Sequence, residues 1–191
     1  MSTGIIASRY ATALLKLVDE TGGDEAVVRQ VHVLQEALDK VPELRRVVDD
    51  ANVVSSDQKL SLFQTVVSEE EMAPELRKFL ELLIRNGRIS DCRLIFNSFL
   101  SLYYKSRGIV RGRLVFPSAS DMASAGAGLE AKVSALIEAR TGKKLLLTTL
   151  VDESLIGGFV LEVEDQLLDA SVSHQLEMIK RQFIERNRRI V

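Results

Sequence analysis

The hydrophobic spacing of this 191-residue chain changes near Gly108, and this change constrains the fold more than any other feature. Before it, apolar residues recur every three or four positions, which is the spacing of amphipathic helices. After it, some segments alternate apolar and polar residues, which is typical of strands with one buried face. We therefore expect an α+β protein, with a helical domain over residues 1–105 and a small α+β domain over residues 106–191.

Six helices are predicted in the first part. Their starts and ends carry the residues typical of those places, namely glycine after a last turn, proline in a first turn, and a serine paired with a glutamine three positions later in a capping box. Because the connections are short, neighbouring helices should pack roughly antiparallel in a bundle. These markers are Gly22-Gly23, Pro42, Ser55 with Gln58, Pro74 and Asn86-Gly87.

The second part predicts the order strand, helix, strand, strand, helix. Val110, Leu114 and Phe116 alternate with Arg111 and Arg113 in the first strand. The helices are identified by a return to spacings of three and four residues. The five elements are expected within residues 110–116, 129–137, 145–150, 159–164 and 172–183.

Composition excludes several classes of protein. The net charge is −2 and the sequence pI is about 5.8, so bulk attraction to nucleic acid or to an anionic membrane is not expected. No apolar run reaches the roughly 20 residues that span a bilayer, and the chain starts with no secretory or transit segment. The single Cys92 cannot form an internal disulfide, which indicates a reducing compartment. With one Cys and two His, no metal site is expected.

The search for catalytic chemistry finds one candidate pair and one candidate loop. Asp169 precedes His174 at the start of the last helix, but no nucleophile or oxyanion site is evident beside them. Gly157-Gly158 leads into a strand, whereas a phosphate-binding loop leads into a helix and usually carries a following lysine. We therefore expect no catalytic residue and no cofactor, and we expect a bend where two elements cross closely.

Two features indicate binding to other proteins. Tyr10 lies among small residues that include Ala13, which is typical of a shallow helix-binding groove or of close packing inside a bundle. The last helix ends with five basic residues between Lys180 and Arg189 and one acidic residue, Glu185. This excess either complements the helix dipole or forms a basic docking tail for an acidic partner helix.

Four segments resemble one known family, the delta subunit of F-type ATP synthase, to which the mitochondrial oligomycin sensitivity-conferring protein is related. The resemblance extends in order and spacing over essentially the whole chain, and its most specific part is the carboxy-terminal motif. The segments are Ala7–Leu14, Asn86–Arg88, Val151–Phe159, and Leu168–Val172 with Leu176.

The resemblance implies a non-catalytic peripheral-stalk, or stator, subunit without a cofactor. Residues 1–105 would bind amino-terminal segments of the alpha subunits, and residues 106–191 would bind the b subunits. The chain would thus tie the catalytic head to the stalk so that rotor torque drives proton-coupled ATP synthesis. It would lie at the cytoplasmic face of the bacterial plasma membrane, reaching the membrane only through the complex.

The resemblance also places the binding sites. The alpha segment would lie between the first and fifth helices, and the stalk would contact the last helix and the surface near residues 152–158. Two alternatives stay open from the residues alone: a small cytoplasmic enzyme using Asp169 and His174, and a helical regulatory binding module. The expected groove residues are Tyr10, Ala13, Leu14, Phe79 and Leu83, and the expected stalk or signature residues are Asp152, Leu155, Gly157, Gly158, Asp169 and Ser171.

Overall fold

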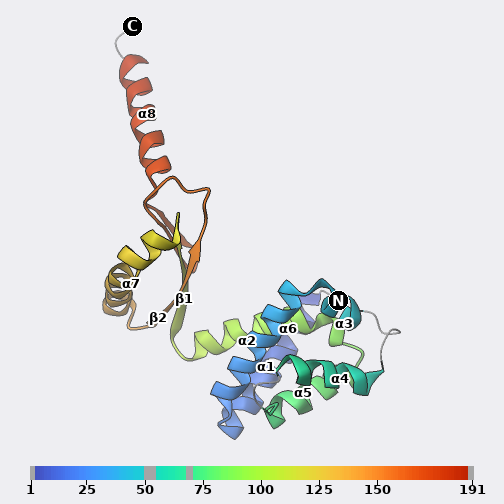
Figure 1. Cartoon of the computed structure of the whole chain (residues 1–191). Helices are drawn as coiled ribbons and strands as arrows, with labels where there is room; N and C mark the ends of the chain where they lie inside the picture. The colour runs from blue at the N-terminus through green and yellow to red at the C-terminus, as the bar shows by residue number, and fades with distance from the viewer. Residues whose placement is uncertain (1–2, 50–54, 68–70, 189–191) are drawn as a thin grey trace. The chain divides into compact units, whose positions relative to one another are not determined.

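The computed structural model describes residues 3–49, 55–67 and 71–188. The chain divides into two units, Met1–Tyr103 and Tyr104–Val191, and each is described by itself (Figure 1). The described residues comprise a mostly helical first part followed by a four-stranded sheet with helices. The α+β class predicted from the sequence is confirmed.

The first unit is a bundle of amphipathic helices. Each of the six predicted helices is present, and the last of them follows a single 3-10 turn, η1 (Ile89–Asp91). The sequence of α6 continues a few residues into the second unit. The helices are α1 (Thr3–Thr21), α2 (Asp24–Lys40), α3 (Pro42–Asp49), α4 (Ser56–Val66), α5 (Pro74–Arg85) and α6 (Cys92–Ser106).

The predicted helix boundaries form by the expected local interactions. Ser55 and Gln58 make a reciprocal capping box, in which the Ser55 N–H donates to the Gln58 side chain at 2.9 Å and the Gln58 N–H donates to Ser55 Oγ at 3.4 Å. Gly22 follows α1 with a φ of 74°, a conformation that costs other residues free energy. These contacts satisfy backbone groups that helix ends leave unpaired.

The core of the bundle is formed by the inward stripes of its helices. Each fully buried aliphatic or aromatic side chain contributes about 1.5–3 kcal/mol of hydrophobic stabilisation. Lys59 is also buried, and its Nζ donates to the Val48 carbonyl oxygen at 3.3 Å, in the last turn of α3. The largest fully buried side chains of this unit are Leu14, Leu34, Leu38, Phe63, Leu76, Leu80, Leu83, Ile95, Phe96, Phe99 and Leu100.

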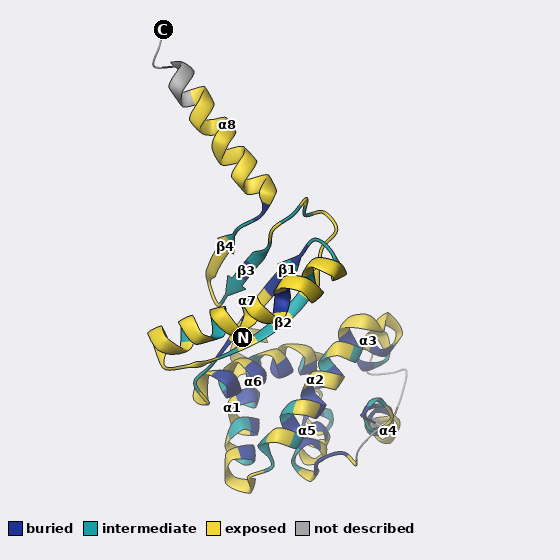
Figure 2. Ribbon diagram, turned by 60° about the vertical axis from the view of Figure 1, so that its left-hand side comes forward, coloured by how far each residue is buried: buried dark blue, intermediate teal, exposed yellow. Residues whose placement is uncertain are grey.

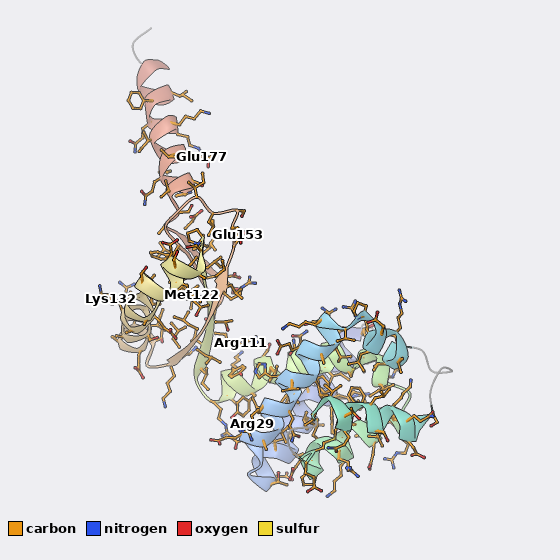
Figure 3. All side chains as sticks on the ribbon, viewed as in Figure 1. Arg29, Arg111, Met122, Lys132, Glu153 and Glu177 are labelled. Carbon is orange, nitrogen blue, oxygen red and sulfur yellow. The ribbon has the colours of Figure 1, made fainter. Side chains whose placement is uncertain are left out.

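The second unit is a mixed sheet with strand order β2-β1-β3-β4. β1 and β2 are parallel and are connected through α7, whereas β3 pairs antiparallel with β1 and with β4. Leu114, Phe116 and Leu161 form the core on one sheet face, where Met122 and other residues of α7 pack (Figure 3). The elements are β1 (Ile109–Phe116), α7 (Ala119–Thr141), β2 (Lys144–Val151), β3 (Val160–Val163), β4 (Gln166–Asp169) and α8 (Val172–Arg188).

The sequence misses β4, so the predicted count of three strands is wrong. β4 has only four residues, and the adjacent Leu167 and Leu168 hide the alternation that identifies strands. Its hairpin turn contains neither glycine nor proline, and Glu164 adopts a φ of 51° there. β4 therefore forms because it pairs with β3, since its local sequence carries neither of the usual hairpin signals.

Gln30 joins α2 to the segment before α5 and generates a stability prediction. Its buried side chain donates to the Glu71 carbonyl oxygen at 3.0 Å and accepts from the Ala73 N–H at 2.9 Å. Gln30→Met leaves that buried N–H unpaired, so it should lower the free energy of unfolding by about 1–3 kcal/mol in urea titrations of the full chain. Val33→Met, on the exposed side of α2, should change the free energy of unfolding by less than about 0.5 kcal/mol. Equal losses in the two variants would contradict a stabilising role for the Gln30 hydrogen bonds.

Candidate protein-binding surfaces

A groove of about 520 Å³ lies between α1 and α5. Its apolar lining comes from Ala13 and Leu17 on α1 and from Phe79 and Leu82 on α5. Ala13 is exposed and small, so it leaves room for another backbone to approach α1 closely. Three charged residues also line the groove: Lys78, Glu81 and Arg85.

The structure separates the expected groove residues into three groups. Ala13 is exposed and lines the groove, and Phe79 lines it as a core residue that is only 3% exposed. Leu14 and Leu83 are completely buried in the bundle core. Tyr10 packs edge-on against Phe79 with ring centroids 6.5 Å apart, and its hydroxyl oxygen accepts a hydrogen bond from the Asn86 side chain at 3.1 Å. Tyr10 therefore contacts a groove residue without lining the groove itself.

Sequence reasoning missed two apolar lining residues, Leu17 and Leu82, as well as the three charged ones. Leu17 lies four positions after Ala13, and Leu82 lies three positions after Phe79. Residues at these spacings share a helix face, so this signal was available in the sequence. This spacing could not identify groove residues, because residues that face the core recur at the same spacing.

A second hollow of about 510 Å³ lies between α4 and α5. Six of its eight lining residues are polar, and only Leu60 and Met72 are apolar. A helix bound there would leave much of its apolar face against polar groups, so this hollow is a poorer helix-binding site. The comparison favours the groove between α1 and α5.

In the second unit, the signature residues hold a loop against the start of α8. The Val172 N–H donates to the Gly157 carbonyl oxygen at 2.9 Å, and the Ala170 N–H donates to that of Phe159 at 3.0 Å. Gly158 has a φ of 81°, and a Cβ atom there would lie 2.3 Å from the Ala170 carbonyl oxygen. Only glycine permits this crossing, which agrees with the close approach expected from the sequence.

Asp169 and Ser171 form the first turn of this junction. The Asp169 carboxylate accepts from the Ser171 N–H at 2.9 Å, and the buried Ser171 hydroxyl accepts from the His174 N–H at 3.2 Å. The hydrogen bonds from Ser171 hold the pKa of Asp169 below its ordinary value. His174 Nδ1 lies 3.8 Å from the same carboxylate. The Asp169 carboxylate and the Ser171 hydroxyl thus accept backbone hydrogen bonds at the start of α8, which gives Asp169 a structural role.

Asp152 and Leu155 shape the other end of the same loop. The Asp152 carboxylate accepts from the Ser154 N–H at 2.9 Å. Hydrogen bonds from the Ser154 side chain and from this N–H lower the pKa of Asp152. The Leu155 N–H donates to the Asp152 carbonyl oxygen at 3.1 Å, which closes a turn. Ile156, which follows, is 74% exposed.

The apolar face of α8 is uncovered in the structure. Every residue from Val172 to Ile184 is exposed, including Leu176, Ile179 and Phe183 (Figure 2). These residues recur at the spacing of a helix-packing stripe, which normally contacts another element. An exposed stripe of this kind marks a surface for another protein.

The described part of the chain contains no cluster of three or more His, Cys, Asp or Glu able to hold a metal ion. Within the same residues, no helix has both the length and the apolar character needed to cross a bilayer. The first unit carries a groove and the second an uncovered apolar helix. Surfaces of this kind are typical of the class of proteins that bind other proteins.

Comparison with known proteins gives the family. The model of the ATP synthase delta (OSCP) subunit family matches residues 6–183, so the chain belongs to this family. It is 33% identical to ATP synthase subunit delta of Phocaeicola vulgatus over the full length of both chains, and 32% identical to that of Solidesulfovibrio magneticus over 95% of this chain and 97% of the relative. A chain in the Toxoplasma gondii mitochondrial ATP synthase hexamer shares the fold, with a TM-score of 0.66 and 24% identity over 93% of this chain and 97% of that one.

Membership in this family confirms the resemblance drawn from the sequence motifs. The chain is a non-catalytic component of the peripheral stalk of F-type ATP synthase, the complex of ATP synthesis and proton transport. The alternative of a small enzyme using Asp169 and His174 is therefore wrong.

The crossing at Gly158 generates a prediction with a matched control. Gly142 also has a positive φ, of 68°, but a Cβ atom there would meet no described residue beyond its chain neighbours within 4 Å. Gly142→Ala should cost about 1–2 kcal/mol of stability, because only the backbone conformation is strained. Gly158→Ala should cost more than about 3 kcal/mol, because the new methyl group also meets backbone atoms. Chemical unfolding of the full chain measures both, and equal costs would contradict the close crossing.

The lowered pKa of Asp169 predicts an acid-dependent stability. Because its carboxylate is stabilised in the folded chain, this contribution is present above about pH 4 and is lost as the pH falls through the lowered folded pKa. Asp169→Asn should therefore lower the thermal midpoint at pH 7 and converge with the unmodified chain near pH 2. Asp165→Asn, in the β3–β4 turn, serves as the control. A constant difference between Asp169→Asn and the unmodified chain at every pH would refute the assignment.

Proposed function

We propose that this chain couples the catalytic head of the ATP synthase to its stalk by binding one neighbour with each unit. Residues 1–105 bind an amino-terminal segment of an alpha subunit, and residues 106–191 bind the b subunits. The observation that supports this proposal is that each unit carries its own uncovered apolar surface, the groove in the first and α8 in the second. A protein that bound one neighbour would need only one of them.

The groove between α1 and α5 suits an amphipathic helix. Ala13 permits close approach, while the half-buried Leu17 and Leu82 offer apolar contacts to residues that recur every three or four positions in the bound helix. Phe79 forms the nearly buried floor between them. Tyr10 supports Phe79 from the side. Leu14 and Leu83 are buried in the core, where they hold α1 and α5 at the separation that the bound helix needs.

The stalk site is proposed on α8 and the neighbouring loop. Ile156 and the apolar stripe of α8 are exposed and supply the contacts. The signature residues position α8 and do not contact the partner themselves, because their hydrogen bonds and close crossing set the direction in which α8 leaves the sheet. Those residues are Asp152, Leu155, Gly157, Gly158, Asp169 and Ser171.

The physical task is adhesion under torque. Rotation of the central rotor drags the head with it unless the head is held, so the joint needs slow dissociation. Helices laid in apolar grooves meet this need, because affinity differences between related complexes lie mainly in the off-rate. We place the chain at the cytoplasmic face of a bacterial plasma membrane, held there by the complex, and the bacterial relatives support this location.

The groove is tested by filling it. Ala13→Trp should weaken binding of the full chain to stalk-free catalytic head by about 30-fold or more, because its side chain occupies the space of the alpha segment. Thr12→Trp places the same side chain at an exposed position of α1 outside the groove lining and should bind as the unmodified chain does. Sedimentation with the purified head measures both, and circular dichroism verifies helicity. Equal binding by the two variants would refute this site.

A further inference from the structure

β2 forms one edge of the sheet and has no neighbouring strand on its outer side among the described residues (Figure 2). It has eight residues, and its segment Leu145–Val151 contains no charged residue, proline or glycine. β4, at the other edge, has only four residues and ends in Asp169. Proteins usually protect sheet edges with short strands, charges or proline, because an open edge pairs with other strands. β2 lacks this protection, so its edge is a candidate surface for strand pairing.

The backbone hydrogen bonds identify which groups β2 presents at this edge. The Lys144 N–H donates to the Gly108 carbonyl oxygen at 3.1 Å, and the Asp152 N–H donates to that of Phe116 at 2.8 Å. Even-numbered residues of β2 therefore bond toward β1. Because backbone groups alternate in direction along a strand, the odd-numbered residues direct their N–H and C=O groups outward. The outward set is Leu145, Leu147, Thr149 and Val151.

The side chains of β2 on the face away from α7 are exposed. Leu147 packs against the core cluster on the α7 face, so the even-numbered residues occupy the opposite face. Among them, Leu146 and Leu150 are 46% and 42% exposed, and Thr148 between them is also exposed. No residue of β2 is buried. A strand added at this edge would therefore meet two leucines and a threonine on the open face.

The sequence around β2 complements itself in the antiparallel direction. Lys143 and Lys144 precede the apolar residues, Asp152 and Glu153 follow them, and all four are exposed. When two copies run antiparallel, the basic start of each strand meets the acidic end of the other, and opposite charges across a strand pair are favourable. In a parallel pair the like-charged ends would meet and repel each other. The charges therefore favour antiparallel pairing of β2 with a second copy of the chain.

The charges also select one register. A twofold axis at Thr148 places Lys144 opposite Asp152 of the second copy and Leu146 opposite its Leu150. Thr148 then faces itself across the axis, and threonine pairs of this kind are favourable. The outward-directed backbone groups on either side of Thr148 become hydrogen-bonded partners, as antiparallel pairing requires.

Neighbouring registers lose these matches. Moving the axis by one residue toward the start of β2 would place Lys144 opposite Leu150. Moving it toward the end would place Asp152 opposite Leu146. Each shift sets a charged group against an apolar side chain and removes its opposite charge. The register about Thr148 is therefore the one that β2 favours.

We propose that two copies of this chain pair through the free edges of β2, antiparallel and centred on Thr148, so that their sheets become continuous. The contact of two strands is smaller than a standard protein interface, so the dimer is weak, with a dissociation constant on the order of 10 µM. The pairing covers an edge that is otherwise open to strands of other proteins. It goes beyond the proposed function, because it uses neither the groove between α1 and α5 nor α8.

The test measures self-association of the full chain by sedimentation velocity at low salt, from about 1 to 300 µM. The unmodified chain should change from monomer to dimer within this range. Thr148→Lys and Thr148→Glu should each weaken association by about tenfold or more, because the axis sets like charges directly opposite each other. An equimolar mixture of these two variants should dimerise again, because opposite charges then meet. Thr12→Lys, at an exposed position of α1, is the matched control and should associate as the unmodified chain does.

Recovery in the mixture distinguishes lost pairing from misfolding, because two unfolded variants could not restore a defined dimer, and circular dichroism verifies the fold of each. An unmodified chain that stays monomeric over the whole range would overturn the proposal. A dimer that persists in both Thr148 variants would place the contact elsewhere. A mixture that associates no better than either variant would exclude the register about Thr148. Species larger than a dimer would show that the pairing does not close symmetrically, which would also overturn it.

Discussion

The second unit depends on a backbone crossing that only glycine permits. At Gly158 the loop after β2 passes so near the Ala170 carbonyl that no side chain fits between them. The hydrogen bonds from Val172 and Ala170 to this loop then follow from the crossing. The crossing fixes where α8 begins, so the residues of the carboxy-terminal motif position this helix against the loop.

In the first unit, the surface available for binding is the groove between α1 and α5. One face of α1 buries Leu14 in the core, while Ala13, the adjacent residue in the sequence, faces the groove. The helix can serve both purposes because neighbouring residues in a helix point in different directions. The buried residues hold α1 and α5 apart at a fixed distance, and the small exposed residue leaves the space between them open.

Together these features describe a protein whose chemistry is adhesion. Its polar groups are used in turns, caps and helix junctions, as the Asp169, Ser171 and His174 cluster illustrates. Membership in the delta (OSCP) family assigns the chain to the peripheral stalk, where rigid attachment is the requirement. An uncovered apolar surface on each unit supports the proposal that the chain binds one neighbour with each unit.

The residues alone predict the change from helical to alternating periodicity, the helix boundaries marked by glycine, proline and the Ser55–Gln58 capping box, and the motifs of the family. These features depend on local backbone preferences and on spacing, which neighbouring residues specify. Only the tertiary structure decided that Leu14 is core and Ala13 is surface, that β4 pairs with β3, and that the stripe of α8 remains uncovered. Each of these depends on which distant segment packs against a residue, and an apolar position has the same spacing whether it faces its own core or a partner.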